Sequence, residues 1–275
     1  MALAIDGTTR LNGGTAMPRL GLGVYQISSG GSCERAVDCA LKAGYRHIDT
    51  ASFYDNEADV GRAVRESGLP REQVFVTTKL WNSDHGYASA IKAGEKSLKR
   101  LGLDRIDLYL IHWPEPGRRA ESWRALIELR QKGIARSIGV SNYTIAHLRE
   151  LMASSDVVPA VNQVEFNPFL YQRELLEFCT AHGIALVAYC PLARAHKLDD
   201  VRLKKIAAKH GKTAAQVMIR WILQHGVAAI PKSSRPERIR ENARVFDFAL
   251  GNDDMAQLDA LDEGYRTCWD PTHVR

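Results

Sequence analysis

The sequence predicts a single (β/α)₈ barrel (a TIM barrel), and three observations carry that prediction. Short β-prone apolar runs alternate with amphipathic helical patterns along the 275 residues. About eight such units are present, and a barrel of this kind typically takes about 250 residues. Neither a linker nor a break in composition divides the chain. A doubly wound open sheet is the rival fold, but the unbroken chain favours one closed domain over residues 1–275.

The elements are expected in the following order. A short β-hairpin lies between Ala4 and Leu22, with Ala4–Asp6 followed by turn residues, then Thr9–Leu11 and Asn12–Gly14. The barrel strands are expected at Leu20–Val24, Arg46–Asp49, Val74–Lys79, Ile106–His112, Ser137–Val140, Ala160–Glu165, Ala185–Tyr189 and Val227–Ile230. The helices are expected at Cys33–Ala43, Glu57–Ser67, Tyr87–Leu101, Ala120–Gln131, Ile145–Ala153, Arg173–Ala181, Asp200–His210 and Ala214–Gln224. An extra C-terminal helix follows at Asp253–Leu261.

Two regularities support these assignments. Helix apolar positions recur at spacings of three and four residues, and several helices stop at a glycine suited to a C-cap, such as Gly44 and Gly102. Strands that alternate with helices pair in parallel through right-handed crossovers. Both regularities favour a parallel barrel.

Composition restricts the class of partner. The 37 basic and 32 acidic residues leave a net charge of +5, and no basic stripe with interleaved aromatics predicts nucleic-acid binding. A local pocket for a phosphorylated small molecule fits this charge better. No apolar run is long enough to span a membrane, and the first residues lack the pattern of a signal peptide. The five cysteines show no C-x-x-C pair and no metal-binding spacing. We therefore expect reduced thiols, a cytoplasmic location and no metal.

Four polar residues stand at or just after the ends of three successive predicted strands: Asp49, Tyr54, Lys79 and His112. Each alone has a common structural explanation, such as a turn former, a surface residue or a hydrogen-bonded histidine. In a parallel barrel, however, the C-terminal ends of all strands open onto one face, where active sites are built. We therefore expect these side chains to meet in one pocket.

Together these residue types suit the reduction of a carbonyl. Hydride addition leaves an alkoxide that needs a proton donor, which Tyr54 supplies. An unperturbed tyrosine has a pKa near 10, and a nearby Lys79 ammonium is expected to lower that pKa. Asp49 keeps the buried Lys79 charged. His112 donates a hydrogen bond that orients the carbonyl.

A phosphate-binding segment is predicted late in the chain. Gly21-Leu22-Gly23 lacks the third glycine of a dinucleotide fingerprint and no helix follows directly, so a Rossmann site is rejected. Residues 230–238 follow the last strand and open a helix at Pro236. Barrels commonly bind phosphate at this place, and Lys232, Ser233 and Arg238 suit a phosphate monoester. A solvated basic turn is the alternative.

These features together resemble the aldo-keto reductase family over essentially the whole chain. The matching segments are Gly44–Ala51 with Tyr54 and Asn56-Glu57, Thr77–Trp81, Asp107–Pro114, Ile138–Asn142, Val161–Glu165 and Ile230–Ser233. The length is most similar to small microbial and protozoan members, such as diketogluconate reductases and trypanosomatid prostaglandin F synthases. The resemblance implies a (β/α)₈ barrel that binds NADPH in an extended pose.

The resemblance also implies roles for individual residues. Asp49, Tyr54, Lys79 and His112 match the catalytic tetrad, with Tyr54 as the acid. The residues implied to bind the cofactor are Ser141, Asn142 and Gln163 at the nicotinamide carboxamide, Tyr189 against its ring, Lys232, Ser233 and Arg238 at the 2′-phosphate, and Glu241 and Asn242 near the adenine. The residues implied to line the substrate pocket are Val24, Tyr25, Trp81, Trp113 and Trp269.

The sequence departs from the family pattern at three places. Asn167 stands where many members have histidine, Cys190 replaces a usual serine, and residues 193–196 replace a glycine-rich stretch near the pyrophosphate. Arg194 in that stretch is expected to reach the pyrophosphate. None of these departures touches the tetrad.

The function expected from the sequence is NADPH-dependent reduction of a small aldehyde or ketone by a monomer. A dedicated prostaglandin F synthase or keto-sugar (diketogluconate) reductase is an alternative, because substrate choice depends on loop shape. A non-catalytic binding or regulatory barrel is a third, which the complete tetrad disfavours.

Overall fold

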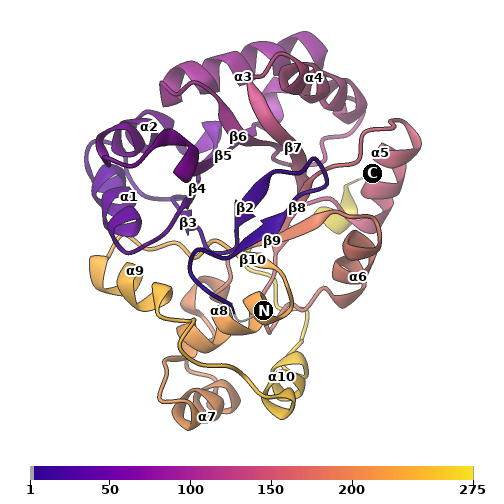
Figure 1. Cartoon of the computed structure of the whole chain (residues 1–275). Coiled ribbons are helices and arrows are strands. Elements are labelled where there is room, and N and C mark those ends of the chain that lie inside the picture. Colours follow the sequence, from indigo (N-terminus) through magenta and orange to yellow (C-terminus); the bar gives the residue numbers. More distant parts are fainter. Residues whose placement is uncertain (1–2, 275) are drawn as a thin grey trace.

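The computed structural model describes residues 3–274, so the two ends of the predicted domain lie outside the described residues. Eight parallel strands form one sheet in the order β10-β9-β8-β7-β6-β5-β4-β3. Their bounds are β3 Leu22–Gly23, β4 His47–Asp49, β5 Phe75–Leu80, β6 Ile106–Ile111, β7 Ala135–Ser141, β8 Val161–Glu165, β9 Ala185–Tyr189 and β10 Ala228–Ala229. Parallel bridges from Leu20 to Ala229 and from Gly23 to Lys232 join the first strand to the last. The sheet is therefore a closed barrel (Figure 1), as predicted.

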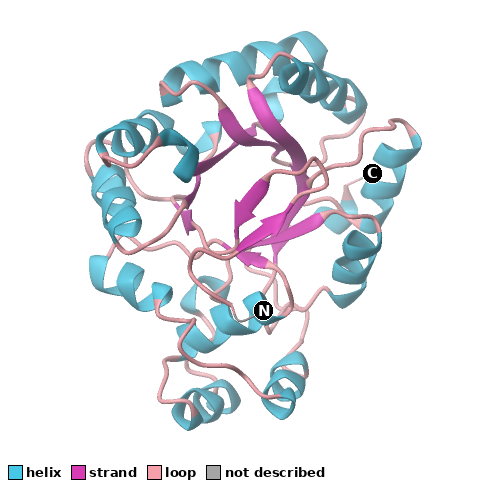
Figure 2. Ribbon diagram, viewed as in Figure 1, coloured by secondary structure: helices cyan, strands magenta, loops and turns pink. Residues whose placement is uncertain are grey.

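Helices surround the barrel (Figure 2). Their bounds are α1 Ser32–Lys42, α2 Glu57–Glu66, α3 Tyr87–Leu101, α4 Arg119–Gln131, α5 Ile145–Ala153, α6 Arg173–Ala181, α7 Val201–Lys209, α8 Ala214–Gln224, α9 Pro236–Ala243 and α10 Asn252–Asp259. Most ends lie within two residues of the sequence prediction, a difference ordinary for helix termini. At α7 the difference has a cause, because Asp200 caps the helix by accepting hydrogen bonds from the Arg202 and Leu203 amides. Among the described residues, no helix is both long and apolar enough to cross a membrane.

The N-terminal hairpin forms, and one of its expected strands, Thr9–Leu11, is confirmed with a shift of one residue, whereas the other is wrong. Strand β1 (Thr8–Arg10) pairs antiparallel with β2 (Ala16–Pro18). The predicted segment Ala4–Asp6 is not a strand, since it turns at once through a Gly7 amide to Ala4 carbonyl hydrogen bond of 2.9 Å. The Asn12–Gly14 turn instead connects the two strands, with Gly14 at φ +85°.

The hairpin closes one mouth of the barrel (Figure 1). Met17 on β2 is fully buried and belongs to an apolar cluster inside the barrel with residues from the beginnings of strands, including Phe75 and Ala228. The closed mouth is therefore the N-terminal one, and the C-terminal mouth is left for a site.

The first strand, β3, is shorter than the predicted Leu20–Val24, and the glycines in this segment pack closely against neighbouring residues. A Cβ atom at Gly21 would lie 2.8 Å from the His47 ring, and one at Gly23 would lie 2.9 Å from the Ile230 carbonyl oxygen. Only glycine allows the backbone to approach so closely. The two glycines thus close the barrel instead of opening a Rossmann turn.

Candidate active site

A cavity of about 1460 Å³ lies at the C-terminal ends of the strands. Tyr54 and His112 line it, and so do Lys232 and Arg238. The predicted site residues on this wall are Tyr25, Asp49, Tyr54, Trp81, His112, Trp113, Ser141, Asn142, Gln163, Tyr189, Lys232, Ser233, Arg238, Glu241, Asn242 and Trp269. Residues remote in sequence therefore share one space.

A continuous polar chain joins three of the four residues at the strand ends. The Lys79 ammonium donates to Asp49 Oδ1 at 2.6 Å and to the Thr50 carbonyl oxygen at 2.9 Å. It lies 3.4 Å from the Tyr54 hydroxyl oxygen. Lys79 itself is fully buried and does not line the cavity, whereas Tyr54 and Asp49 do.

The fourth residue, His112, completes the cluster. Its ring packs edge-on against Tyr54, with centroids 5.7 Å apart, and against Trp81 at 5.1 Å. Among the described residues its buried Nδ1 has no hydrogen-bond partner. A buried imidazole nitrogen without a partner is costly, and the ring that carries it lines the cavity.

Burial controls the charge states in this cluster. Desolvation raises the pKa of Tyr54 well above its ordinary value, and the Asp49 carboxylate adds to the rise. This direction is opposite to the sequence expectation that Lys79 lowers the Tyr54 pKa, because desolvation of the phenol is the largest influence. Burial and the Lys79 charge hold the pKa of His112 well below its usual range. Tyr54 is consequently a protonated phenol and His112 a neutral imidazole at neutral pH.

Local structure fixes Tyr54 in place. It ends the 3₁₀ turn Ser52–Tyr54, and the Ser52 hydroxyl donates to the Lys79 carbonyl oxygen at 2.9 Å. The buried Asn56 amide donates to the carbonyl oxygens of Val24 and Ile27, at 3.0 and 3.1 Å. The loops that carry Tyr25 and Tyr54 are therefore tied together. Sequence reasoning noted Asn56 only as part of a motif and missed this positioning contact.

A hydrogen-bonded row lines the middle of the cavity. Tyr189 Oη donates to Asn142 Oδ1 at 2.7 Å, and Asn142 Nδ2 donates to the His112 carbonyl oxygen at 3.0 Å. Ser141 Oγ donates to the Gln163 carbonyl oxygen at 2.7 Å. Gln163 Nε2 donates to Asp49 Oδ2 at 2.7 Å. Gln163 thus links this row to the Lys79–Asp49 pair, a contact that the sequence did not indicate.

Aromatic rings surround the opening near Tyr54. Trp81 lies 6.5 Å and Trp113 lies 5.4 Å from Trp269, measured between ring centroids. Phe53, absent from the sequence prediction, stacks on Trp81 at 3.8 Å and also lines the cavity. Apolar rings around a few polar groups are typical of a small-molecule site.

Val24 is the one predicted pocket residue that the structure contradicts. Its side chain is fully buried in the core outside the barrel and does not line the cavity. Side chains alternate in direction along extended backbone. Because its neighbours Gly23 and Tyr25 line the cavity, Val24 faces the opposite side.

Two basic side chains, Lys232 and Arg238, line the cavity. Within residues 3–274, neither Lys232 nor Arg238 forms an ion pair. Burial, followed by the nearby Arg194 charge, lowers the pKa of Lys232. Glu241 accepts a hydrogen bond from Thr213 Oγ1 at 2.7 Å. Cations that line a cavity and have no acidic partner suit an anionic ligand.

The stretch at residues 193–196 keeps a left-handed backbone without glycine. Ala193, Arg194 and Ala195 have φ of 46°, 51° and 68°, values that glycine adopts without steric cost. Arg194 donates to Gln26 Oε1 at 3.2 Å and lies on the cavity wall. Its contact with a pyrophosphate stays a prediction.

Fold and site together define an α/β-barrel enzyme whose active-site cavity lies at the C-terminal ends of the strands. The model of the aldo/keto reductase family matches residues 19–263. The chain belongs to this family.

Relatives of this family match over nearly their full length. The chain is 48% identical to glyoxal reductase of Bacillus subtilis, covering 100% of this chain and 99% of the relative. It is 48% identical to the 9,11-endoperoxide prostaglandin H2 reductase of Trypanosoma cruzi, covering 95% and 93%. The crystal structure of a Bombyx mori aldo-keto reductase in complex with NADP matches with a TM-score of 0.89 at 36% identity, covering 96% and 95%.

Proposed function

We propose that this protein reduces aldehydes and ketones to alcohols with NADPH, and that Tyr54 donates the proton. The observation that carries the proposal is the chain from Asp49 through Lys79 to the Tyr54 hydroxyl, with bonds of 2.6 and 3.4 Å, beside a neutral His112. Family membership supports the reaction class, and the NADP complex of the Bombyx mori enzyme supports the cofactor.

The residues present fit NADPH. Lys232 and Arg238, which form no ion pair within residues 3–274, offer a site for its 2′-phosphate, and Ser141, Asn142 and Tyr189 line the same cavity as Tyr54. When bound, NADPH supplies the hydride for the carbonyl carbon. We also propose that the 275 residues form one domain and that the protein is a cytoplasmic monomer.

The side chains divide the remaining work. Tyr54 holds a proton at neutral pH and delivers it to the carbonyl oxygen as negative charge develops there. Lys79 stabilises the tyrosinate that is left, and Asp49 balances the buried ammonium. Neutral His112 donates a hydrogen bond to the carbonyl oxygen and so fixes its position.

The substrate is proposed as a small carbonyl compound, with glyoxal-type dicarbonyls first to be tested because the Bacillus relative is named for one. Prostaglandin H₂ or keto-sugar reduction remains the second candidate. The identities to the glyoxal and prostaglandin reductases are both 48%, so similarity alone does not choose between them. A screen of aldehydes, dicarbonyls, keto-sugars and prostaglandin H₂ with NADPH separates these candidates.

The proton-donor role is tested with Tyr54→Phe. We expect kcat for reduction of 4-nitrobenzaldehyde and of glyoxal to fall roughly 10²–10⁴-fold, the usual contribution of general acid catalysis, while NADPH still binds. The matched control is Tyr87→Phe, which removes a hydroxyl from the protein surface. NADPH consumption measures the rate and cofactor fluorescence measures binding. Equal turnover by wild type and Tyr54→Phe would exclude Tyr54 as the donor.

A further inference from the structure

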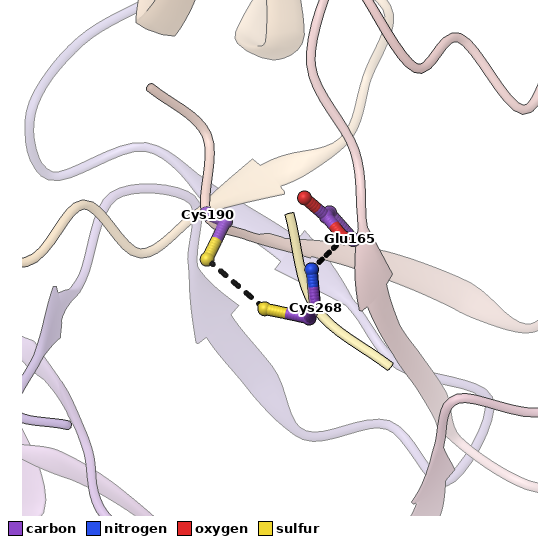
Figure 3. A group of neighbouring side chains, drawn as sticks. All are labelled: Glu165, Cys190 and Cys268. Carbon is purple, nitrogen blue, oxygen red and sulfur yellow. Dashed lines mark hydrogen bonds between the residues drawn. The ribbon is translucent and has the colours of Figure 1, made fainter. Parts of the chain in front are cut away.

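Two cysteines face each other at the edge of the cavity. Cys190 follows strand β9 directly, and Cys268 lies in the C-terminal tail, 78 positions further on. Their sulfur atoms are 3.6 Å apart (Figure 3). A disulfide needs the sulfurs to close to about 2.05 Å, a short movement for two side chains that already point toward one another.

The backbone around both cysteines is held in position. Glu165 at the end of β8 is fully buried, and its carboxylate accepts a hydrogen bond from the Thr267 amide at 2.8 Å. It also accepts one from the Cys268 amide at 3.1 Å (Figure 3). On the other side the Cys190 carbonyl oxygen accepts from the Ala193 amide at 2.9 Å. These backbone contacts therefore hold the two thiols facing each other.

A metal ion is the competing use of this cluster, since ligand atoms of Glu165, Cys190 and Cys268 lie within 4.8 Å of one another. The Glu165 carboxylate is already occupied, because it accepts the two tail amides and the Thr267 hydroxyl. A metal would also require both thiols to lose protons beside that carboxylate. The contacts favour a bond between the sulfurs.

The two thiols differ from the other cysteines in access. Cys190 and Cys268 are partly exposed and line the cavity, whereas Cys33, Cys39 and Cys179 are buried. The thiol contact raises the pKa of Cys190 and lowers that of Cys268. Cys268 is consequently the better nucleophile of the pair.

We propose that Cys190 and Cys268 are a modification site at which a hydroperoxide forms a reversible disulfide. The Cys268 thiolate attacks one peroxide oxygen of hydrogen peroxide, which gives a sulfenic acid and hydroxide. The Cys190 sulfur then attacks the Cys268 sulfur and displaces the hydroxyl group. Two thiols and one peroxide thus become one disulfide and two waters. A dithiol reductant reverses the step.

The disulfide would restrain the tail over the active site. Cys190 follows Tyr189 and Cys268 precedes Trp269, and both of these aromatic residues line the cavity. The bond fixes Trp269 relative to the end of β9. The consequence for carbonyl reduction rests on the proposed function, but the formation of the bond does not.

Peptide mapping tests the bond directly. After hydrogen peroxide treatment, the intact protein should lose the mass of two hydrogen atoms and retain three of its five titratable thiols. Trypsin digestion without reductant should then give peptide 174–194 linked to peptide 267–275. Cys190→Ser and Cys268→Ser should abolish this species. Cys179→Ala is the matched control, since Cys179 lies in the same tryptic peptide and its variant should still form the link.

Three results would overturn the proposal: a sulfenic or sulfinic product without a link, a link through Cys179, or a peroxide-insensitive thiol count. Zinc binding with loss of both thiols, reversed by a chelator and not by dithiothreitol, would favour a metal site instead. NADPH-linked turnover before and after oxidation is a separate readout. An enzyme without turnover but with the mapped disulfide would contradict the proposed function alone.

Discussion

His47 shows how a single buried residue makes this protein sensitive to acid. It is fully buried on β4, and its Nε2 lies 2.9 Å from Thr77 Oγ1. Desolvation lowers its pKa to about 4, whereas an unfolded histidine titrates near 6.5. The folded protein therefore binds this proton less readily than the unfolded chain. The stabilisation is complete above about pH 6.5 and is lost as the pH falls toward about 4.

We expect His47 to contribute about 3 kcal/mol to this acid destabilisation, since the difference of about 2.5 pKa units corresponds to that free energy. Urea unfolding of wild type near pH 7 and near pH 4 measures the total. His47→Gln keeps a polar group near Thr77 but does not titrate, so its stability should fall less over the same range. His182→Gln, at an exposed position, is the control. An unchanged pH dependence in His47→Gln would contradict the assignment.

For the four residues of the tetrad, the sequence predicts their position but not the pKa of Tyr54. The predicted strand ends identified Asp49, Lys79 and His112 as site candidates. The structure brings these residues together with Tyr54. The direction of the Tyr54 pKa could not be predicted, because it depends on how much protein surrounds the phenol. Their catalytic roles stay predictions until the Tyr54→Phe measurement.

Gly61 determines how closely two helices pack. It lies in α2, and a Cβ atom there would lie 1.7 Å from the carbonyl oxygen of Leu101 at the end of α3. The two backbones meet without a side chain between them. In the sequence Gly61 is only an unfavourable residue inside a helical pattern, so the contact was not visible there.

We expect Gly61→Ala to destabilise the fold by at least about 3 kcal/mol, the upper part of the range for overpacked sites, because the atom it meets is rigid backbone. The higher helix propensity of alanine recovers only about 1 kcal/mol. Urea unfolding, or the yield of soluble protein, measures the loss. Ala58→Ser, at an exposed position of the same helix, should change little. A Gly61→Ala protein as stable as wild type would show that α2 and α3 separate easily.

At the scale of the whole molecule, one cavity holds both the candidate proton donor and the candidate phosphate-binding cations. The polar cluster around Tyr54 lines it, and so do the cations Lys232 and Arg238, which have no acidic partner among residues 3–274. Tyr54 and Lys232 are 178 positions apart in the chain, and their segments meet because the barrel closes between β3 and the segment after β10.

Coenzyme preference tests this arrangement. We expect Arg238→Ala to weaken NADPH binding by roughly tenfold or more, because a charge-assisted hydrogen bond contributes about 1.5–3 kcal/mol. NADH binding, without the 2′-phosphate, should change little. Arg240→Ala on the same helix is the control, since Arg240 is exposed and does not line the cavity. Fluorescence titration at low and high salt measures both affinities, and an equal effect on the two coenzymes would exclude a 2′-phosphate contact.

The sequence by itself determined the barrel, the order of its strands and the strand ends that carry Asp49, Lys79 and His112, because hydrophobic period, glycine caps and strand ends are local properties of the chain. Only the tertiary structure decided contacts between distant segments. It placed Val24 in the core, paired β1 with β2, linked Gln163 to Asp49 and opposed Cys190 to Cys268. The physical reason is closure of the barrel. Which way a side chain points, and which residues it meets across the cavity, depend on how all eight strands come together.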